Sequence, residues 1–157
     1  MDATHFMKRA IALSRSSADR PGTAPFAAVI VKDGEVVGEG LNHVGAKCDP
    51  TSHGEIEAIR DACAKLGTTD LSGCTMYASC EPCAMCVMAM YRAGIGRLVY
   101  GMSLTQSLEL LPPPVDTAAV LREAVKPVAE RSMPATQMMA EEACEAVAEW
   151  SKRTEQG

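Results

Sequence analysis

Aromatic side chains and excess positive charge are both scarce in this sequence. Only 4% of the 157 residues are aromatic, which argues against a broad surface for stacking nucleic-acid bases. Lys and Arg number 15 against 20 Asp and Glu, so the formal charge is -5 and the overall field repels phosphate backbones. A small substrate that is not a polyanion therefore fits the composition better than a nucleic acid.

Long apolar runs and targeting signals are also scarce. The longest apolar run, residues 84–91, has eight residues, whereas a membrane-spanning helix needs about 20. Residues 1–10 carry charged side chains and no apolar stretch of signal-peptide length, so we expect a cytoplasmic protein without a membrane span. An odd number of cysteines suits a reducing compartment and predicts metal-binding or buried thiols rather than disulfides. The cysteines stand at positions 48, 63, 74, 80, 83, 86 and 144.

Periodicity and turn residues predict alternating helices and strands over the first two thirds of the chain. Asp2 suits a helix N-cap, since apolar residues recur after it at helical spacing. Asp33-Gly34 tolerates the positive φ angles of a type I′ turn and predicts a hairpin. Ser52 suits the N-cap of a second helix, and Pro82 the first turn of a third. The predicted elements are a helix over 2–18, strands over 26–32 and 35–41, a loop over 42–51, a helix from 52, a strand over 74–79, a helix over 82–93 and a strand over 97–101.

The last third of the sequence is less regular. Segment 103–114 ends in three consecutive prolines. Residues 117–126 predict a helix, 127–131 a short strand and 137–152 a final helix. We find no internal repeat or linker, so we expect one domain over 1–157. The alternation of helices and strands predicts an α/β sheet with parallel members.

Two short motifs contain residues of the kinds that bind zinc. His53-Gly54-Glu55 is followed, after 26 intervening residues, by Pro82-Cys83-Ala84-Met85-Cys86. Cys-x-x-Cys at a helix start places both sulfurs on one side, and the helix dipole there favours thiolates. We expect His53, Cys83 and Cys86 to bind Zn²⁺, which with three protein ligands keeps a tetrahedral position for water. The combined pattern is typical of zinc deaminases.

Glu55 is the residue predicted to move protons at this site. Zinc makes a bound water acidic enough to supply hydroxide near neutral pH, even where two thiolates offset the charge of the ion. Glu55 lies in the same helical turn as His53 but at a different azimuth, so it can reach the water without binding the metal. A positioned carboxylate of this kind contributes about 10² to 10⁴-fold to a rate.

Each of these residues also has a structural interpretation. Ser52-x-x-Glu55 is a capping box, in which Glu55 would only bond back to the Ser52 amide. Cys-x-x-Cys by itself is equally typical of a redox pair or of a closed zinc site, for which Cys80 is the candidate fourth ligand. Asn42, at the end of the hairpin, suits a turn.

The sequence resembles the cytidine deaminase-like superfamily, in the branch that holds guanine deaminases, fungal-type cytosine deaminases and tRNA adenosine deaminases. Besides the two zinc motifs, the resemblance rests on Asn42 and on segments 25–31, 49–53, 79–82 and 94–101. It implies a three-layer α/β/α sandwich with a central five-stranded mixed sheet. It also implies a ring-shaped substrate bound near the zinc site and a homodimer whose interface helps to close that site.

The resemblance also implies a role for each candidate site residue. Phe26 can line the ring pocket or belong to the core, and Trp150 can close the site or pack against the sheet. The matched positions are His53, Cys83 and Cys86 as zinc ligands, Glu55 as proton shuttle, Asn42 as a side chain that hydrogen-bonds the ring, and Gly54 as a backbone N–H that contacts the substrate.

Two details within the resemblance bear on the substrate. Gly54 replaces the Ala of most relatives, as in fungal-type cytosine deaminases, whereas Ser79-Cys80-Glu81-Pro82 looks like the guanine deaminase version. We therefore expect a zinc-dependent hydrolase that releases ammonia from a free, guanine-like nucleobase. Cytosine or isocytosine is the alternative substrate.

Two further function classes remain open at this point. A tRNA adenosine deaminase would need a basic RNA-facing surface, but residues 137–157 carry five Glu against one Lys and one Arg, a net charge of -3. A zinc-stabilised module without catalysis would gain folding energy from the metal but would have no use for Glu55.

Overall fold

The computed structural model describes residues 2–111 and 116–154. They fall into two compact units, divided between Thr117 and Ala118. The single domain that we predict over 1–157 stays a prediction. Pro112, Pro113 and Pro114 lie outside the described residues.

A mixed sheet of four strands forms the centre of the first unit. Its strands are β1 (Ala24–Lys32), β2 (Glu35–Asn42), β3 (Thr75–Cys80) and β4 (Arg97–Met102), in the spatial order β2-β1-β3-β4. β1 pairs antiparallel with β2 and β3, and β3 pairs parallel with β4. The β1–β2 turn has φ angles of 50° at Asp33 and 80° at Gly34, as a type I′ turn requires.

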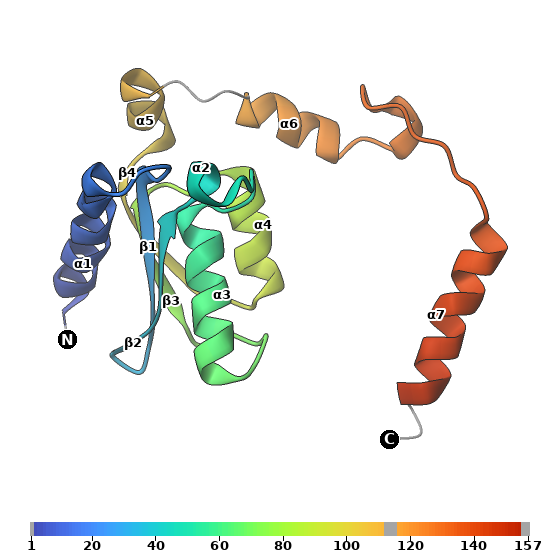
Figure 1. Ribbon diagram of the computed structural model, residues 1–157, viewed down its shortest axis with the longest axis horizontal. Helices are drawn as coiled ribbons and strands as arrows, with labels where there is room; N and C mark the ends of the chain where they lie inside the picture. The colour runs from blue at the N-terminus through green and yellow to red at the C-terminus, as the bar shows by residue number, and fades with distance from the viewer. Residues whose placement is uncertain (1, 112–115, 155–157) are drawn as a thin grey trace. The chain divides into compact units, whose positions relative to one another are not determined.

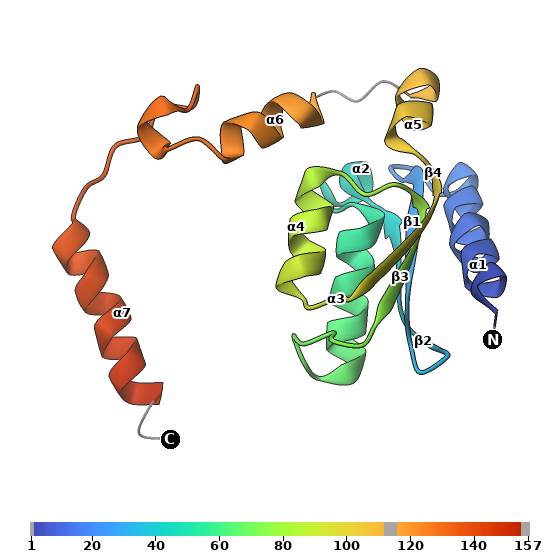
Figure 2. The ribbon, with the colours of Figure 1, turned by 180° about the vertical axis from the view of Figure 1, so that it is seen from behind.

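Helices cover both faces of this sheet, which confirms the predicted three-layer α/β/α sandwich. α1 lies on one face, and α3 and α4 lie on the other (Figures 1 and 2). The helical segments of the first unit are α1 (Ala3–Arg15), η1 (Ser16–Asp19), α2 (Val44–Lys47), α3 (Gly54–Leu66), α4 (Ala84–Arg92) and α5 (Leu104–Leu110).

The alternation of side chains along β1 explains why both faces are covered. Ala28 and Ile30 are fully buried in the cluster that includes residues of α3 and α4. Val29 and Val31 point the other way, into the cluster that contains Phe6 of α1. Because successive strand residues face opposite sides, an almost continuous apolar strand needs a helix layer on each side.

The fifth strand that the family resemblance implies is not confirmed, and the predicted strand over 127–131 is wrong. The sheet has four strands among the described residues, and the segment predicted as a strand over 127–131 is the 3₁₀ helix η2 (Val128–Glu130). Pro127 is its N-cap residue. A proline has no N–H to donate to a neighbouring strand, so this segment forms a helical turn more readily than a strand.

Two helix starts also differ from the predicted ones. α3 begins at Gly54 with His53 as its N-cap, one residue after the predicted cap Ser52. α5 falls in the segment that we leave without regular structure, and its N-cap Ser103 forms a complete capping box with Gln106.

The second unit contains α6 (Thr117–Ala124), η2 and α7 (Ala140–Thr154). Both helices were predicted, with α7 beginning three residues later than expected. α7 has no buried residue. Over the described residues, no helix has the length and hydropathy needed to cross a membrane.

Candidate functional site

The starts of two helices hold the three predicted zinc ligands. His53 is the N-cap residue of α3, Cys83 is the N-cap residue of α4, and Cys86 lies in the first turn of α4. Neither N-cap side chain makes a capping hydrogen bond. The free N–H groups and positive dipole ends of both helices therefore favour thiolate anions between them.

The distances among the three donor atoms fit a zinc ion. Nδ1 of His53 lies 3.7 Å from Sγ of Cys83 and 3.6 Å from Sγ of Cys86, and the two sulfurs are 3.7 Å apart. Tetrahedral zinc with ordinary bond lengths would place N and S about 3.6 Å apart and two sulfurs about 3.8 Å apart. Among the described residues, these three form the group whose donor atoms can share one ion.

The charges of the two thiols show what the metal contributes. Hydrogen bonds with Cys86 and His53 lower the pKa of Cys83 to about 4. The same sulfur–sulfur contact, together with burial, raises the pKa of Cys86. One thiolate thus forms readily and a second is opposed by its neighbour. A divalent cation supplies the positive charge that lets both sulfurs ionise.

Cys80 is not part of this group of donors. It is the last residue of β3 and is buried, and burial raises the pKa of its thiol. Within residues 2–111 and 116–154, the donor group consists of three residues and excludes Cys80. The geometry thus favours an open site with three ligands over a closed one with four.

Glu55 is buried beside the metal ligands. Its side chain is 7% exposed, and burial raises the pKa of its carboxyl group. The thiols of Cys83 and Cys86 and the imidazole of His53 all influence the pKa of this carboxyl group, so it lies next to the donor group. The capping box with Ser52 is not formed, because the Ser52 N–H donates to the carbonyl oxygen of Asp49 and the Ser52 hydroxyl donates to Glu57. Glu55 is thus available for proton transfer.

Asn42 ends β2 with a buried side chain whose two ends have different roles. Its Oδ1 accepts a hydrogen bond from the backbone N–H of Val44, at 3.2 Å. The turn interpretation and the substrate interpretation are therefore compatible. The oxygen holds the turn, and the amide nitrogen is the group that Asn42 can offer to a ring carbonyl.

Gly54 and Phe26 come together where α3 meets β1. A Cβ atom at Gly54 would lie 2.7 Å from the carbonyl oxygen of Phe26 and 2.8 Å from Cα of Ala27. Only a residue without a side chain allows the first turn of α3 to approach the strand this closely. Phe26 is half-buried, and its role in a ring pocket stays a prediction.

Gly40 sets the position of the same helix against β2. A Cβ atom there would lie 2.0 Å from the carbonyl oxygen of Gly54 and 2.3 Å from the backbone nitrogen of Ala58. The backbones of β2 and α3 are therefore in direct contact beside the site. The residues on either side of Gly54 are the ligand His53 and the carboxylate Glu55.

Trp150 lies in the second unit, on α7, with 67% of its side chain exposed. Its predicted contact with a substrate stays a prediction.

Sequence reasoning missed Glu57. This carboxylate lies in the first turn of α3 and accepts hydrogen bonds from Lys47 and Ser52. The signal available was weak, since an acidic residue in the first turn of a helix is common.

The variant His53→Ala tests the metal ligands. We expect it to lower zinc affinity by about 10²-fold or more, because loss of a residue that merely orients a metal ligand already costs up to that much. Metal analysis after dialysis against graded zinc buffers measures the change. His5→Ala, which alters an exposed histidine on α1, serves as the matched control and should retain the metal. Equal zinc content in both variants would contradict the assignment.

The chain matches a known family and several relatives. The model of the cytidine and deoxycytidylate deaminase zinc-binding region matches residues 1–102. A guanine deaminase of Bacillus subtilis is 40% identical over 134 residues, which cover 85% of this chain and 84% of that protein. The solved structure of guanine deaminase from Bacillus subtilis has a TM-score of 0.86 at 38% identity and covers 97% of this chain and 95% of its own. A tRNA-specific adenosine deaminase of Agrobacterium fabrum is 42% identical over 100 residues, 64% of this chain and 65% of that protein.

Proposed function

The chain belongs to the family defined by the cytidine and deoxycytidylate deaminase zinc-binding region, and on that premise we propose that it deaminates guanine as a free base. The reaction would use one water molecule, replace the exocyclic amino group of the ring by a carbonyl oxygen, and release ammonia and xanthine. Zinc is the cofactor of the family, and the donor set of His53, Cys83 and Cys86 fits it.

The extent of the similarity is the observation that carries the choice of guanine. The family region ends at residue 102, yet the similarity to the Bacillus guanine deaminase spans 134 residues, so at least 32 of them lie beyond it. The similarity to the Agrobacterium tRNA deaminase spans only 100 residues. The C-terminal third is therefore the part of the chain that favours a guanine deaminase.

The first task of the site is to supply a nucleophile and move its proton. When bound, zinc with three protein ligands holds a water molecule and makes it acidic enough to supply hydroxide near neutral pH. Glu55 accepts a proton from this water and delivers it to the ring nitrogen beside the amino-bearing carbon. It then takes the remaining proton from the oxygen added to that carbon, which becomes the carbonyl oxygen, and gives it to the departing amino group, which leaves as ammonia. The raised pKa of the buried Glu55 carboxyl suits a group that must both accept and return a proton.

The second task is to hold the ring in position. The amide nitrogen of Asn42 can donate to the ring carbonyl oxygen, because its Oδ1 is already bonded to Val44. The backbone N–H of Gly54 is the second donor that the family resemblance implies. Phe26 beside it supplies an apolar surface. Together they would orient the amino-bearing carbon toward the water.

Two alternatives remain as outcomes of the test. Gly54 keeps cytosine or isocytosine as the second candidate, because fungal-type cytosine deaminases carry glycine at the matching position. Transfer RNA is disfavoured by the net charge of -3 over residues 137–157.

The cytoplasm and a homodimeric assembly complete the proposal. The free state of all seven cysteines is consistent with a reducing compartment. The homodimer rests on the family resemblance.

Ammonia release from a panel of compounds tests the proposed function. Zinc-loaded protein is incubated with guanine, guanosine, cytosine, isocytosine and adenine, and with transfer RNA that is assayed for inosine. We expect turnover of guanine, with cytosine slower by about 10²-fold or more, since a wrong ring leaves polar groups of the pocket unpaired. Inosine in transfer RNA without release from any free base would refute the proposal.

A further inference from the structure

The loop between Asn42 and His53 joins the residue proposed to bind the substrate to a zinc ligand. It contains α2 and returns to α3, so its conformation sets where the Asn42 amide lies relative to the metal site. The backbone N–H of His43 donates to the carbonyl oxygen of Ser52, at 2.9 Å, and closes the loop at its base. Anything that fixes the body of this loop also fixes the spacing between substrate and metal.

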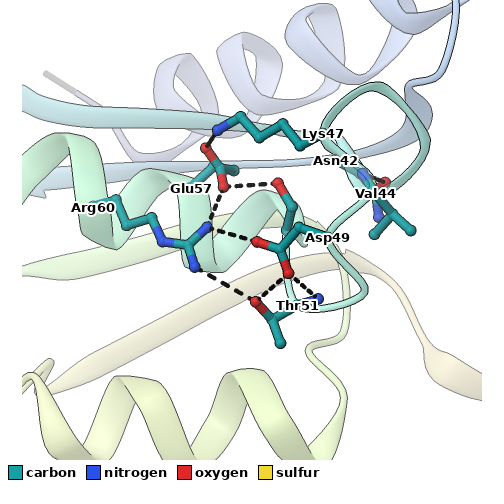
Figure 3. Close-up of polar contacts among 8 residues, drawn as sticks. Asn42, Val44, Lys47, Asp49, Thr51, Glu57 and Arg60 are labelled. Atoms are coloured by element: carbon teal, nitrogen blue, oxygen red, sulfur yellow. Dashed lines mark hydrogen bonds and ion pairs between the residues drawn. The ribbon is translucent and has the colours of Figure 1, made fainter.

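Glu57 holds this loop at two points (Figure 3). Its Oε2 accepts from Nζ of Lys47, the last residue of α2, at 2.5 Å. Its Oε1 accepts from the hydroxyl of Ser52, the fully buried residue directly before His53, at 2.8 Å. One carboxylate thus binds both the middle of the loop and the residue next to the zinc ligand.

A second layer of contacts holds the Glu57 carboxylate itself. Arg60 donates to Oε1 of Glu57 and also lies 3.5 Å from Oδ2 of Asp49 in the loop. Asp49 in turn accepts from the backbone N–H and the hydroxyl of Thr51. The Glu57 side chain is only 12% exposed, whereas those of Lys47 and Arg60 are about half exposed. The shielded carboxylate is therefore the centre of the network.

The charge of Glu57 matches this arrangement. Burial alone would raise the pKa of the Glu57 carboxyl group. The hydrogen bonds from Lys47, Ser52 and Arg60 outweigh this effect and lower the pKa below its usual value. The group is ionised near neutral pH, and charged hydrogen bonds are the stronger kind.

We propose that Glu57 is a positioning residue for deamination, which holds the loop 43–52 so that the Asn42 amide faces a ring placed at the metal site. The inference rests on the proposed function. Glu57 itself contacts neither the substrate nor the metal ligands' donor atoms. Its effect is on substrate binding, transmitted through Lys47 and Ser52.

The variant Glu57→Gln tests this role, because it keeps the shape of the side chain and removes the charge. We expect KM to rise about 10-fold, the loss that corresponds to one charged hydrogen bond. The change in kcat should stay within about threefold and zinc content should stay stoichiometric, since Glu55 and the ligands are untouched. Lys47→Met should raise KM in the same way, and adding it to Glu57→Gln should cause little further loss.

Asp61→Asn is the matched control. Asp61 lies one turn further along α3 and accepts hydrogen bonds from Lys65 and from the backbone of Glu39, but it does not contact the loop. We expect this variant to retain the KM of the unaltered protein. An equal rise in KM in both variants would overturn the inference, as would loss of zinc from Glu57→Gln or an unchanged KM in that variant.

Hydrogen exchange separates this inference from the proposed function, because it needs no substrate. The amides of His43, Lys47 and Asp49 are hydrogen-bonded within or at the base of the loop. Their protection should fall at least about 10-fold in Glu57→Gln, the loss that corresponds to one charged hydrogen bond, and stay unchanged in Asp61→Asn. Unchanged protection in Glu57→Gln overturns the inference even if guanine is deaminated. If the unaltered protein does not deaminate guanine, the proposed function is overturned, whatever the exchange results show.

Discussion

Replacing Glu55 by glutamine is expected to reduce kcat by about 10² to 10⁴-fold while zinc content stays the same. Glutamine keeps the size of the buried side chain but can neither accept nor return a proton. The metal should remain, because the donor atoms belong to His53, Cys83 and Cys86. Steady-state rates of ammonia release, measured beside metal analysis of the same samples, check both parts of the result.

The stability of this variant gives an independent check. Burial raises the pKa of Glu55 above the ordinary carboxyl value of about 4.3. A raised pKa favours the folded state at low pH and loses that advantage as pH rises from the ordinary value through the raised one. At neutral pH glutamine should thus cost no thermal stability in the metal-free protein. A large loss of stability, or full activity, would make Glu55 a structural residue.

Replacing Gly40 by alanine is expected to lower the free energy of unfolding by about 3 kcal/mol, at the upper end of the range for overpacked sites. The new Cβ atom would lie 2.0 Å from the carbonyl oxygen of Gly54. This neighbour is backbone, so β2 and α3 must separate. Urea unfolding of the metal-loaded protein, followed by circular dichroism, measures the change.

Gly96→Ala is the appropriate control for this prediction. No atom lies within 4 Å of a Cβ atom built at Gly96, so a surface change there should stay within about 0.5 kcal/mol. Activity should fall in Gly40→Ala together with stability, because the displaced turn carries His53 and Glu55. Equal unfolding curves for the two variants would show that β2 and α3 can move apart at this contact without loss of stability.

The sequence predicted the fold wherever a local rule matched the tertiary structure. Asp33-Gly34 is one such place, because the turn it favours is the turn that the twist of the hairpin needs. Pro127 shows the opposite case. The segment 127–131 was predicted as a short strand, but Pro127 has no N–H to donate to a neighbouring strand and instead precedes a 3₁₀ turn. α5 was missed because the capping box at Ser103 and Gln106 was not considered.

Some features of the candidate site could also be predicted from the sequence, and others could not. His53, Cys83 and Cys86 could be found because zinc requires particular donor types, and the spacing of the cysteines at a helix start brings their sulfurs together. The partner of Ser52 could not be found in this way. Glu55 and Glu57 are both acidic residues in the first turn of α3, and only the path of the preceding loop decides which of them receives the Ser52 hydroxyl.

Because the metal ligands are far apart along the chain, bound zinc also affects the stability of the folded protein. His53 lies 30 positions before Cys83 and 33 before Cys86. A bound ion is thus a reversible cross-link around α3 and β3, and closing a loop of this length in a flexible chain costs about 3 kcal/mol. An ion at 100 times its dissociation constant would stabilise the folded state by about 2.7 kcal/mol. The amount of folded protein in a cell would then follow the zinc supply. A fall in zinc would lower the amount of folded protein before it lowered the catalytic rate of each folded molecule.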